Sequence, residues 1–306
     1  METTGPGYVR LARSGELARR SGEAAARLHR CDLCPRRCGA DRAAGEMGEC
    51  GIGAQAIVAS YGPHHGEERV LSGWAGSGTV FFSGCSLHCR FCQNWDISHE
   101  VAGVGLDAAG LADVFLLVQE TGCHNLNLVT PSHVVPQILA ALDKAAGRGL
   151  TLPVVYNTSG YDTLPTLALL DGVVDVYLPD LKTLDRRFAA GQLTAIDYPG
   201  AATAAIAEMH RQVGDLTVDG DGLARRGVLV RHLVMPGMSE DTAKVLEWLA
   251  GFGTGTYVNI MGQYRPCGDA AHGACGADLR RRPSPAEMAA ALAAAESAGL
   301  RRAGRH

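Results

Sequence analysis

The stretch TVFFSGCSLHCRFCQNWDIS, residues 79–98, joins a short apolar run to three closely spaced cysteines. Residues 79–82 are mostly apolar, as expected of a strand that is covered on both faces of a parallel sheet. Cys85, Cys89 and Cys92 follow directly. A structural zinc site has four ligands and a disulfide has two sulfurs, so three cysteines in one loop suit neither.

Three thiolates can hold three irons of a four-iron cluster and leave the fourth iron open to a small molecule. We therefore predict that Cys85, Cys89 and Cys92 bind a [4Fe-4S] cluster. The alternative is a zinc site that His88 or His99 completes. Zinc loops usually supply their ligands in separated pairs, and this triplet is more compact than that.

Outward from this stretch, short apolar runs alternate with helix-like segments. Asp107 is a candidate N-cap of a helix that ends before Gly122, and Ser284 begins a capping box with Pro285 at N1. Six strand-helix units favour an α/β fold, either a parallel β/α barrel or an open partial barrel, with its chemistry at the carboxyl ends of the strands. The other expected elements are strands at 125–129, 153–157, 174–178, 228–235 and 256–261, helices over 201–213 and from 239, and a hairpin turn at 219–222.

Composition limits the function classes. The 306 residues are 46% hydrophobic and 20% charged, and the length suits one large domain or one domain with a small appendage. The net charge of -4 argues against a general nucleic-acid or anionic-membrane binder. No signal peptide is visible and no run approaches the roughly 20 apolar residues of a membrane span, so we expect a cytoplasmic protein. Ten cysteines in such a chain indicate metal or redox chemistry.

A second group of cysteines precedes the first strand. Cys31, Cys34, Cys38 and Cys50 supply four thiols in a short, loop-rich segment. Zinc is the usual metal of such a site, and a second iron–sulfur cluster is the alternative, which the spacing does not decide. We expect either a stabilising cap or an electron-entry module. The predicted organisation is a helical or flexible arm (1–27), the four-cysteine segment (28–76), the β/α barrel (77–300) and a solvated basic tail (301–306).

The wider sequence resembles a known family. Besides GSGTVFFSGCSLHCRFCQNWDIS, the stretches CDLCPRRCG, HNLNLVTPSHVVPQIL, VVYNTSGYDTLPTLALLDGVVDVYLPDLK and YVNIMGQYRP are similar to the uncharacterised radical S-adenosylmethionine (SAM) proteins related to the pyruvate formate-lyase activating enzyme. The resemblance covers roughly residues 28–295. It implies a partial (β/α)6 barrel, a [4Fe-4S] cluster, SAM as cosubstrate and a reductant such as flavodoxin or ferredoxin.

The resemblance also implies roles for single residues. Phe91 matches the position that contacts adenine. Thr130 and Ser132 stand where the family often has a Gly-Gly-Glu-like segment for the SAM amino group, so a carboxylate contact is missing there, and His133 is either a ligand or a helix-start residue. Lys182 is a candidate catalytic residue as well as a SAM-binding one. The remaining implied SAM-binding residues are Asn157, Thr158, Ser159, Asp180, Arg231, His232, Val234, Met261, Gln263 and Tyr264.

Two charged sites have structural alternatives. Asp180 and Lys182, two apart on an extended segment, share a face and could both point into the barrel mouth, or they could form a surface ion pair. Arg231 lies in an apolar run and needs a partner. That partner is a SAM carboxylate or, in the structural alternative, an acidic side chain such as Asp180.

The remaining polar motifs are less specific. Cys123 is expected to be a buried thiol. Cys267, His272 and Cys275 lie in a Gly-rich loop and could bind metal, form a disulfide or contribute a reactive thiol, with free thiols as our main expectation. The run from His64 to Glu68 either joins the substrate pocket or is a solvated loop.

Three functional hypotheses follow. The first is a radical SAM enzyme that abstracts hydrogen from a backbone glycine of a partner enzyme and so activates it. The second is a radical SAM enzyme that acts on a small metabolite or a peptide. The third is a non-catalytic iron–sulfur or zinc protein that carries electrons or binds a partner.

Overall fold

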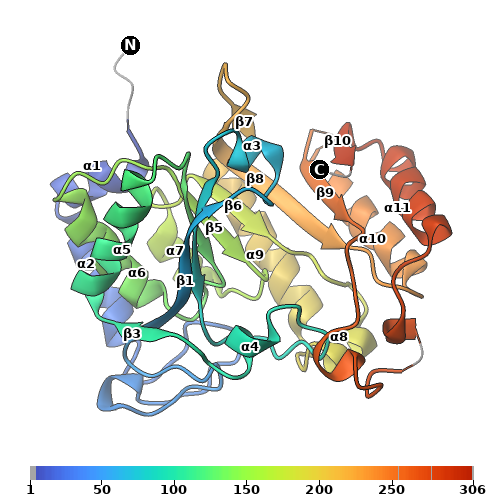
Figure 1. Cartoon of the computed structure of the whole chain (residues 1–306), viewed down its shortest axis with the longest axis horizontal. Helices are drawn as coiled ribbons and strands as arrows, with labels where there is room; N and C mark the ends of the chain where they lie inside the picture. The colour runs from blue at the N-terminus through green and yellow to red at the C-terminus, as the bar shows by residue number, and fades with distance from the viewer. Residues whose placement is uncertain (1–4, 254, 277, 305–306) are drawn as a thin grey trace.

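The computed structural model describes residues 5–253, 255–276 and 278–304. Within these residues the chain forms a mixed α/β fold around one ten-stranded sheet (Figure 1). The strands lie in the order β10-β9-β8-β6-β5-β4-β2-β1-β3, and β7 pairs with β8. The α/β class is therefore as predicted.

All six predicted strands are present. β2, β4, β5, β6, β8 and β9 pair in parallel and lie side by side in chain order, because the connection between each strand and the next contains a helix. The sequence did not predict β1 and β3, which pair antiparallel, or β10, which extends the parallel sheet, whereas β7 and β8 form the hairpin expected around 219–222. The strands are β1 (Ala56–His64), β2 (Ser77–Phe82), β3 (Val104–Leu106), β4 (Leu126–Val129), β5 (Val154–Thr158), β6 (Val176–Pro179), β7 (Thr217–Val218), β8 (Ala224–Leu233), β9 (Tyr257–Met261) and β10 (Arg302–Gly304).

The predicted helix caps are confirmed. The Asp107 carboxylate accepts hydrogen bonds from two amides of the first turn of α5, and Ser284 and Glu287 form the capping box of α11. α9 begins earlier than predicted, at Tyr198, where Pro199 suits a first turn. The helices are α1 (Gly7–Arg13), α2 (Glu16–Ala26), α3 (Arg69–Ser72), α4 (Trp95–Ser98), α5 (Ala108–Glu120), α6 (Val135–Ala146), α7 (Leu164–Leu170), α8 (Arg186–Gln192), α9 (Tyr198–Val213), α10 (Ser239–Ala250) and α11 (Pro285–Ser297).

The two faces of the sheet pack differently. Helices such as α5 and α9 pack on one face, the helix-covered face, and enclose the larger apolar core there. On the opposite face, the inner face, Leu71 of α3 packs with Val155, Leu178 and Leu229 in a smaller core. Because side chains alternate along a strand, residues two apart from these share the inner face.

The arm at the start of the chain is helical, one of its two predicted forms, whereas the end of the chain differs from the prediction. The predicted arm is not flexible over α1 and α2, because Tyr8 and Leu17 are fully buried and the Tyr8 hydroxyl donates to the carbonyl of Leu152. The predicted solvated tail contains β10, and Arg302 lies over the ring of Tyr257 with 4.8 Å between guanidinium carbon and ring centre. Residues 305 and 306 of that tail lie outside the described residues.

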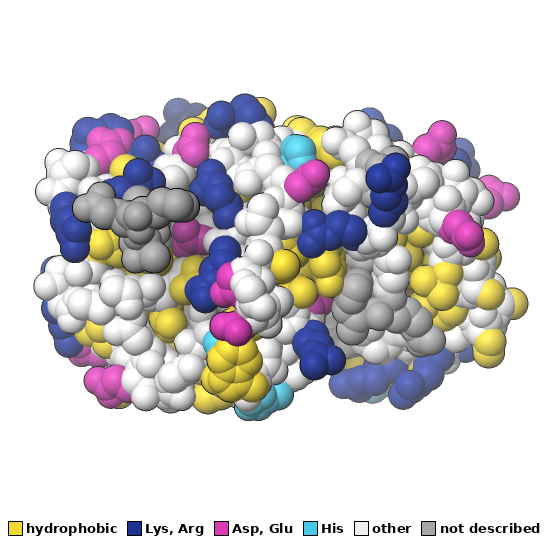
Figure 2. Space-filling model, turned by 90° about the horizontal axis from the view of Figure 1, so that it is seen from above, with side chains coloured by type: hydrophobic (Ala, Val, Ile, Leu, Met, Phe, Trp, Pro, Cys, Tyr) yellow, Lys and Arg dark blue, Asp and Glu magenta, His cyan; other side chains and the backbone are white. Residues whose placement is uncertain are grey.

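The surface carries both signs of charge. Basic and acidic side chains are interspersed on the face that Figure 2 shows. Among the described residues, every helix is too short or too polar to cross a membrane.

Candidate functional site

The three-cysteine loop (residues 83–92) lies at the carboxyl end of β2, as predicted. The amide of Ser83 donates to the carbonyl of Ile57 in β1, and the amide of Gly84 donates to the carbonyl of Ile97 in α4. Gly84 has φ +76°, a left-handed conformation that glycine adopts without strain. The chain can therefore turn sharply from strand to loop just before the first cysteine.

None of the three thiols of this loop forms a disulfide; Cys89 is buried, and Cys85 and Cys92 are partly buried. Burial raises the pKa of Cys89 to about 12, although the nearby ammonium of Lys182 opposes the rise. Burial and the neighbouring Cys89 and Cys92 also raise the pKa of Cys85. The Ser98 hydroxyl donates to Cys92 Sγ over 3.2 Å. Thiols of this kind release protons when they bind a metal.

The two histidines of the zinc alternative have other partners. His88 Nε2 hydrogen-bonds to the carbonyl of Glu49 at 3.0 Å. His99 stacks on Trp95 with 3.7 Å between ring centres, and its Nδ1 hydrogen-bonds to the Ser98 hydroxyl. Across the described ranges, no three His, Cys, Asp or Glu side chains already stand in metal-binding geometry.

Strand register brings four of the implied SAM-binding residues to the inner face. Asn157 is two residues beyond Val155, and Asp180 is two residues beyond Leu178, so both share the inner face. Arg231 is the bridge partner of Asp180 and pairs with Asn259 on β9, and Met261 lies two residues beyond Asn259.

Two other residues that the resemblance implies for SAM binding point toward the helix-covered face. Thr158 lies on the helix-covered face, where its hydroxyl donates to Asp162 over 2.6 Å and hydrogen-bonds to Ser132 at 3.0 Å. His232 is buried there too, with Nδ1 bonded to the carbonyl of Leu181 and Nε2 bonded to the Thr242 hydroxyl. The side chains of Thr158 and His232 are thus engaged in the core, away from Asn157 and Arg231.

The segment after β4 supports the cysteine loop. Thr130 has φ +61°, and its amide donates to the carbonyl of Asn157. His133 Nε2 hydrogen-bonds to the carbonyl of Ser83 at 2.8 Å, and burial lowers the pKa of His133 to about 4. His133 therefore does not start α6. It is a neutral imidazole that holds the base of the three-cysteine loop.

Asp180 and Lys182 form a partly buried ion pair rather than a surface one. Lys182 Nζ lies 2.5 Å from Asp180 Oδ2, and the two side chains are 20% and 24% exposed. Burial lowers the pKa of Lys182, but the charges of Asp180 and nearby Cys89 outweigh that effect and hold the pKa above its usual value. The Tyr198 hydroxyl donates to the carbonyls of Ser159 and Asp180 and fixes this turn. The Lys182 ammonium thus lies near Cys85 and Cys89.

The partners of Arg231 correct two expectations. Its guanidinium donates to both carboxylate oxygens of Glu68 at 2.6 and 2.7 Å, and also to Glu67. Glu68 accepts a further hydrogen bond from Asn259 over 2.6 Å. The structural alternative therefore holds for Arg231, with Glu67 and Glu68 as partners in place of Asp180. These two glutamates are buried and are not part of a solvated loop.

An aromatic group closes one side of the loop. Phe91 packs against Tyr264 and Phe188, with ring centres 6.0 and 6.1 Å apart. The Tyr264 hydroxyl donates to the carbonyl of Leu279 over 2.7 Å. Gln263 is exposed, whereas Val234 is buried and its amide donates to the carbonyl of Met261.

The four-cysteine segment is loop-rich but well packed. Cys31, Cys34 and Cys50 are buried, and burial raises the pKa of Cys34 to about 12. A Cβ atom built on Gly48 would lie 3.3 Å from Cys50 Sγ and 3.5 Å from Cys38 Sγ, so these two sulfurs flank one backbone position.

The Gly-rich loop after β9 packs on the three-cysteine loop. Arg90 donates to Asp269 over 2.8 Å, and its carbonyl accepts from the amide of Ala270. Cys267 and Cys275 form no disulfide, and Cys275 lies beside the carbonyl of Arg90. Arg90 was missed because a loop arginine between cysteines carries no signal of its distant partner.

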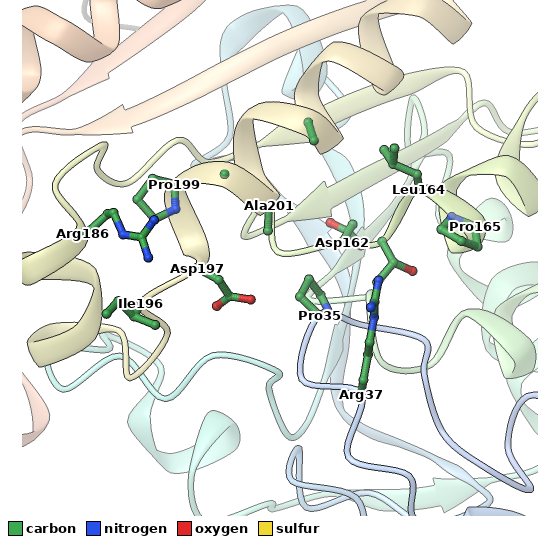
Figure 3. Close-up of a pocket in the computed structure, with 13 residues that line it drawn as sticks. Pro35, Arg37, Asp162, Leu164, Pro165, Arg186, Ile196, Asp197, Pro199 and Ala201 are labelled. Carbon is green, nitrogen blue, oxygen red and sulfur yellow. The ribbon is translucent and has the colours of Figure 1, made fainter.

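A groove of about 550 Å³ lies apart from the three cysteines, on the outside of the molecule. Pro35 and Arg37 of the four-cysteine segment form one wall, and Arg186 and the start of α9 form the other (Figure 3). Asp197 lies between the two arginines, and its carboxylate accepts from the Tyr161 hydroxyl over 2.7 Å. None of the three cysteines lines this groove.

Comparison with known proteins gives one informative match. No family model matches the chain. Over 278 residues the chain is 31% identical to the "Uncharacterized protein MJ0674" of Methanocaldococcus jannaschii. The aligned region covers 88% of this chain and 75% of that relative. The relative's name assigns no activity, so function is argued from the site.

Proposed function

The chain belongs to the family of the uncharacterized protein MJ0674 of Methanocaldococcus jannaschii, and we propose that it is a radical SAM enzyme built on a partial (β/α)6 barrel. One observation carries the proposal. The loop with Cys85, Cys89 and Cys92 follows β2 at the same sheet end as the Asp180–Lys182 pair, near enough that the Lys182 ammonium offsets part of the rise that burial causes in the pKa of Cys85 and Cys89.

The donor set fits a cluster with one open iron. Three free thiols belong to one loop, and both nearby imidazoles are engaged elsewhere. Cys85, Cys89 and Cys92 would hold the cluster, and the Lys182 ammonium would offset part of the charge of three thiolates. When bound, such a cluster supplies the electron that splits SAM into methionine and a 5′-deoxyadenosyl radical.

The inner-face residues next to the loop are suited to bind SAM. Asp180 can accept from the SAM ammonium, and Lys182 can donate to its carboxylate. Asn157 and Met261 share the inner face and can orient the ribose and adenine. Arg231 is not among the SAM-binding residues that we propose, because its guanidinium is already paired with Glu67 and Glu68.

The chain's own residues also keep water from the site. Phe91 and Tyr264 pack together beside the loop and are 5% and 0% exposed. Exclusion of water protects a radical from side reactions. A backbone glycine of a partner enzyme remains our first substrate hypothesis, on the strength of the resemblance alone.

Anaerobic reconstitution tests the proposal. The protein is loaded with iron and sulfide, then reduced with dithionite in the presence of SAM, and 5′-deoxyadenosine and methionine are measured by mass spectrometry. We expect both products from the wild type and from Cys123→Ala, which removes a buried thiol away from the loop, and neither from Cys89→Ala. A wild-type protein with an intact cluster that forms no 5′-deoxyadenosine would overturn the proposal.

A further inference from the structure

The four-cysteine segment touches the three-cysteine loop through its backbone. A Cβ atom built on Gly84 would lie 2.4 Å from the carbonyl oxygen of Cys50, so only glycine permits this approach. Cys50 is therefore in van der Waals contact with the residue that precedes Cys85. The hydrogen bond from His88 to the carbonyl of Glu49 lies next to this contact and joins the same two segments.

Two arginines of the four-cysteine segment add to this interface. Arg36, between Cys34 and Cys38, donates to the carbonyl of Ser86 over 2.8 Å, and its side chain is only 15% exposed. Arg42 donates to the carbonyl of His133 over 2.8 Å, and His133 in turn holds the carbonyl of Ser83. The cysteine groups are thus linked by short, bonded paths.

Arg42 also indicates an anionic group within the four-cysteine segment. The residue is 0% exposed, and its Nη1 lies 3.7 Å from Cys31 Sγ. Its Nη2 is buried with no hydrogen-bond partner. A buried N–H without an acceptor is costly, and the sulfides and thiolates of a cluster would satisfy it. Loading must turn the thiols toward a common centre, which rotation about χ1 allows.

The groove beside this segment suits an acidic partner. Arg37 and Arg186 are exposed on opposite walls, and within the described ranges neither guanidinium has an ion-pair or hydrogen-bond partner (Figure 3). Ile196 and Leu164 line the same groove and are 57% and 49% exposed. An apolar rim with two unpaired cations fits a protein surface that carries carboxylates. Arg37 belongs to the turn that joins Cys34 to Cys38, so this partner would contact the four-cysteine segment.

We propose that the four-cysteine segment is the electron-entry centre of the enzyme. It holds a second iron–sulfur cluster, and its donor is an acidic one-electron carrier protein that docks over Arg37 and Arg186. This inference rests on the proposed function, because only a reducible group in the three-cysteine loop needs such a supply. Zinc, which has no redox chemistry, could not serve in this role.

The transfer balances simply. One electron leaves the reduced carrier, which is oxidised by one electron. It reaches the four-cysteine centre and then the three-cysteine loop, past the contact between Cys50 and Gly84. No bond forms or breaks, and no proton moves.

Metal analysis is the first arm of the test. Iron, zinc and acid-labile sulfide are measured in the reconstituted wild type, in Cys34→Ser and in Cys89→Ala. Each variant is expected to lose about half of the wild-type iron and sulfide. Arg42→Gln, which keeps the segment's cysteines, should shift the reduction potential of the second cluster to a more negative value, because it removes a buried cation. Zinc in the wild-type four-cysteine site would overturn the inference.

Reduction kinetics form the second arm. Reduced flavodoxin of net negative charge is mixed with the loaded protein, and reduction of the cluster in the three-cysteine loop is followed by electron paramagnetic resonance. The double variant Arg37→Glu/Arg186→Glu should be reduced at least about tenfold more slowly by flavodoxin. Its reduction by dithionite should stay within about twofold of wild type. Arg10→Glu, an exposed arginine of α1, is the matched control and should behave as wild type with both reductants.

The outcomes separate the two proposals. If wild-type protein reduced with dithionite forms no 5′-deoxyadenosine, the proposed function fails and takes this inference with it. If the product forms but flavodoxin reduces the charge-reversed variant at the wild-type rate, only the inference fails. Cys34→Ser that accepts electrons from flavodoxin as fast as wild type would overturn it as well.

Discussion

The two cysteine groups are held in place by different interactions. The three-cysteine loop follows β2, which is fixed by hydrogen-bonded ladders to β1 and β4. The four-cysteine segment precedes the first strand and depends on side chains instead, chiefly Arg36, Arg42 and a small apolar cluster around Leu33. The fold alone positions the first group, whereas we expect a bound metal to complete the second.

Metal removal should show the largest difference between the two cysteine groups. Treatment of the loaded protein with a chelator is expected to increase amide hydrogen exchange in residues 28–55 by about two orders of magnitude or more, because metal binding there supplies much of the folding free energy. Exchange in β2, β4 and β5 should change little. Hydrogen exchange with mass spectrometry measures both. Equal increases in the two regions would show that the sheet does not hold the three-cysteine loop independently.

Arg231→Met tests how much the buried ion pair on the inner face of the sheet contributes to the stability of the region that carries the three-cysteine loop. The variant leaves Glu67 and Glu68 buried without a cation, which is expected to lower the free energy of unfolding by about 3–5 kcal/mol. Arg225→Met, which breaks the exposed pair with Asp219, is the matched control and should cost about 1 kcal/mol or less. Urea denaturation of the apoprotein gives both values, and similar losses in the two variants would contradict the assignment.

The same contrast explains what could be predicted from the sequence. The strands of the parallel sheet are short apolar runs with helix caps between them, and both signals are local. The three-cysteine loop was therefore placed correctly at a strand end. Local signals also placed Asp180 and Lys182 correctly at the carboxyl end of β6.

Long-range partners were not predictable in the same way. Arg231 was recognised as a buried charge, but its partners Glu67 and Glu68 lie far away in sequence, on a segment that looked like a solvated loop. Asn157 and Thr158 were grouped together because they are adjacent in sequence, yet alternation along β5 sends them to opposite faces. β1 was missed because Gly62 and Pro63 interrupt its pattern.

Acid should weaken the link between the two regions. His133 joins the four-cysteine segment, through its carbonyl, to the three-cysteine loop, through its ring. Because the ring is buried, the pKa of His133 in the folded protein is about 4, below the usual value of 6.5. The unfolded state therefore binds the proton first, so stability falls as pH decreases from about 6.5 to about 4. The loss should reach about 3 kcal/mol at the acid end of this range.

Comparison with a glutamine variant isolates this contribution. His133→Gln should remove most of that pH dependence, whereas His29→Gln, at an exposed position, should keep the wild-type profile. Urea denaturation of the apoprotein at several pH values measures the difference. Parallel profiles for wild type and His133→Gln would show that the histidine does not titrate in this way.

The smallest difference between a variant and its control is expected from one added methyl group at the contact between the regions. Gly84→Ala and Gly122→Ala both place alanine at a left-handed position, with φ +76° and +80°, so each should cost about 1–2 kcal/mol. Only at Gly84 does the new atom meet a neighbour, the carbonyl oxygen of Cys50, whereas nothing lies within 4 Å at Gly122. The Gly84 variant should therefore lose a further 1–3 kcal/mol or so from overpacking.

That additional loss has a distinct signature, because it comes from separation of the two segments rather than from backbone strain. Hydrogen exchange around residue 50 should rise in Gly84→Ala and stay at the wild-type level in Gly122→Ala. If the two variants lose equal stability and show equal exchange, the four-cysteine segment does not depend on this contact, and the shortest path between the two cysteine groups must run through Arg36 and Ser86.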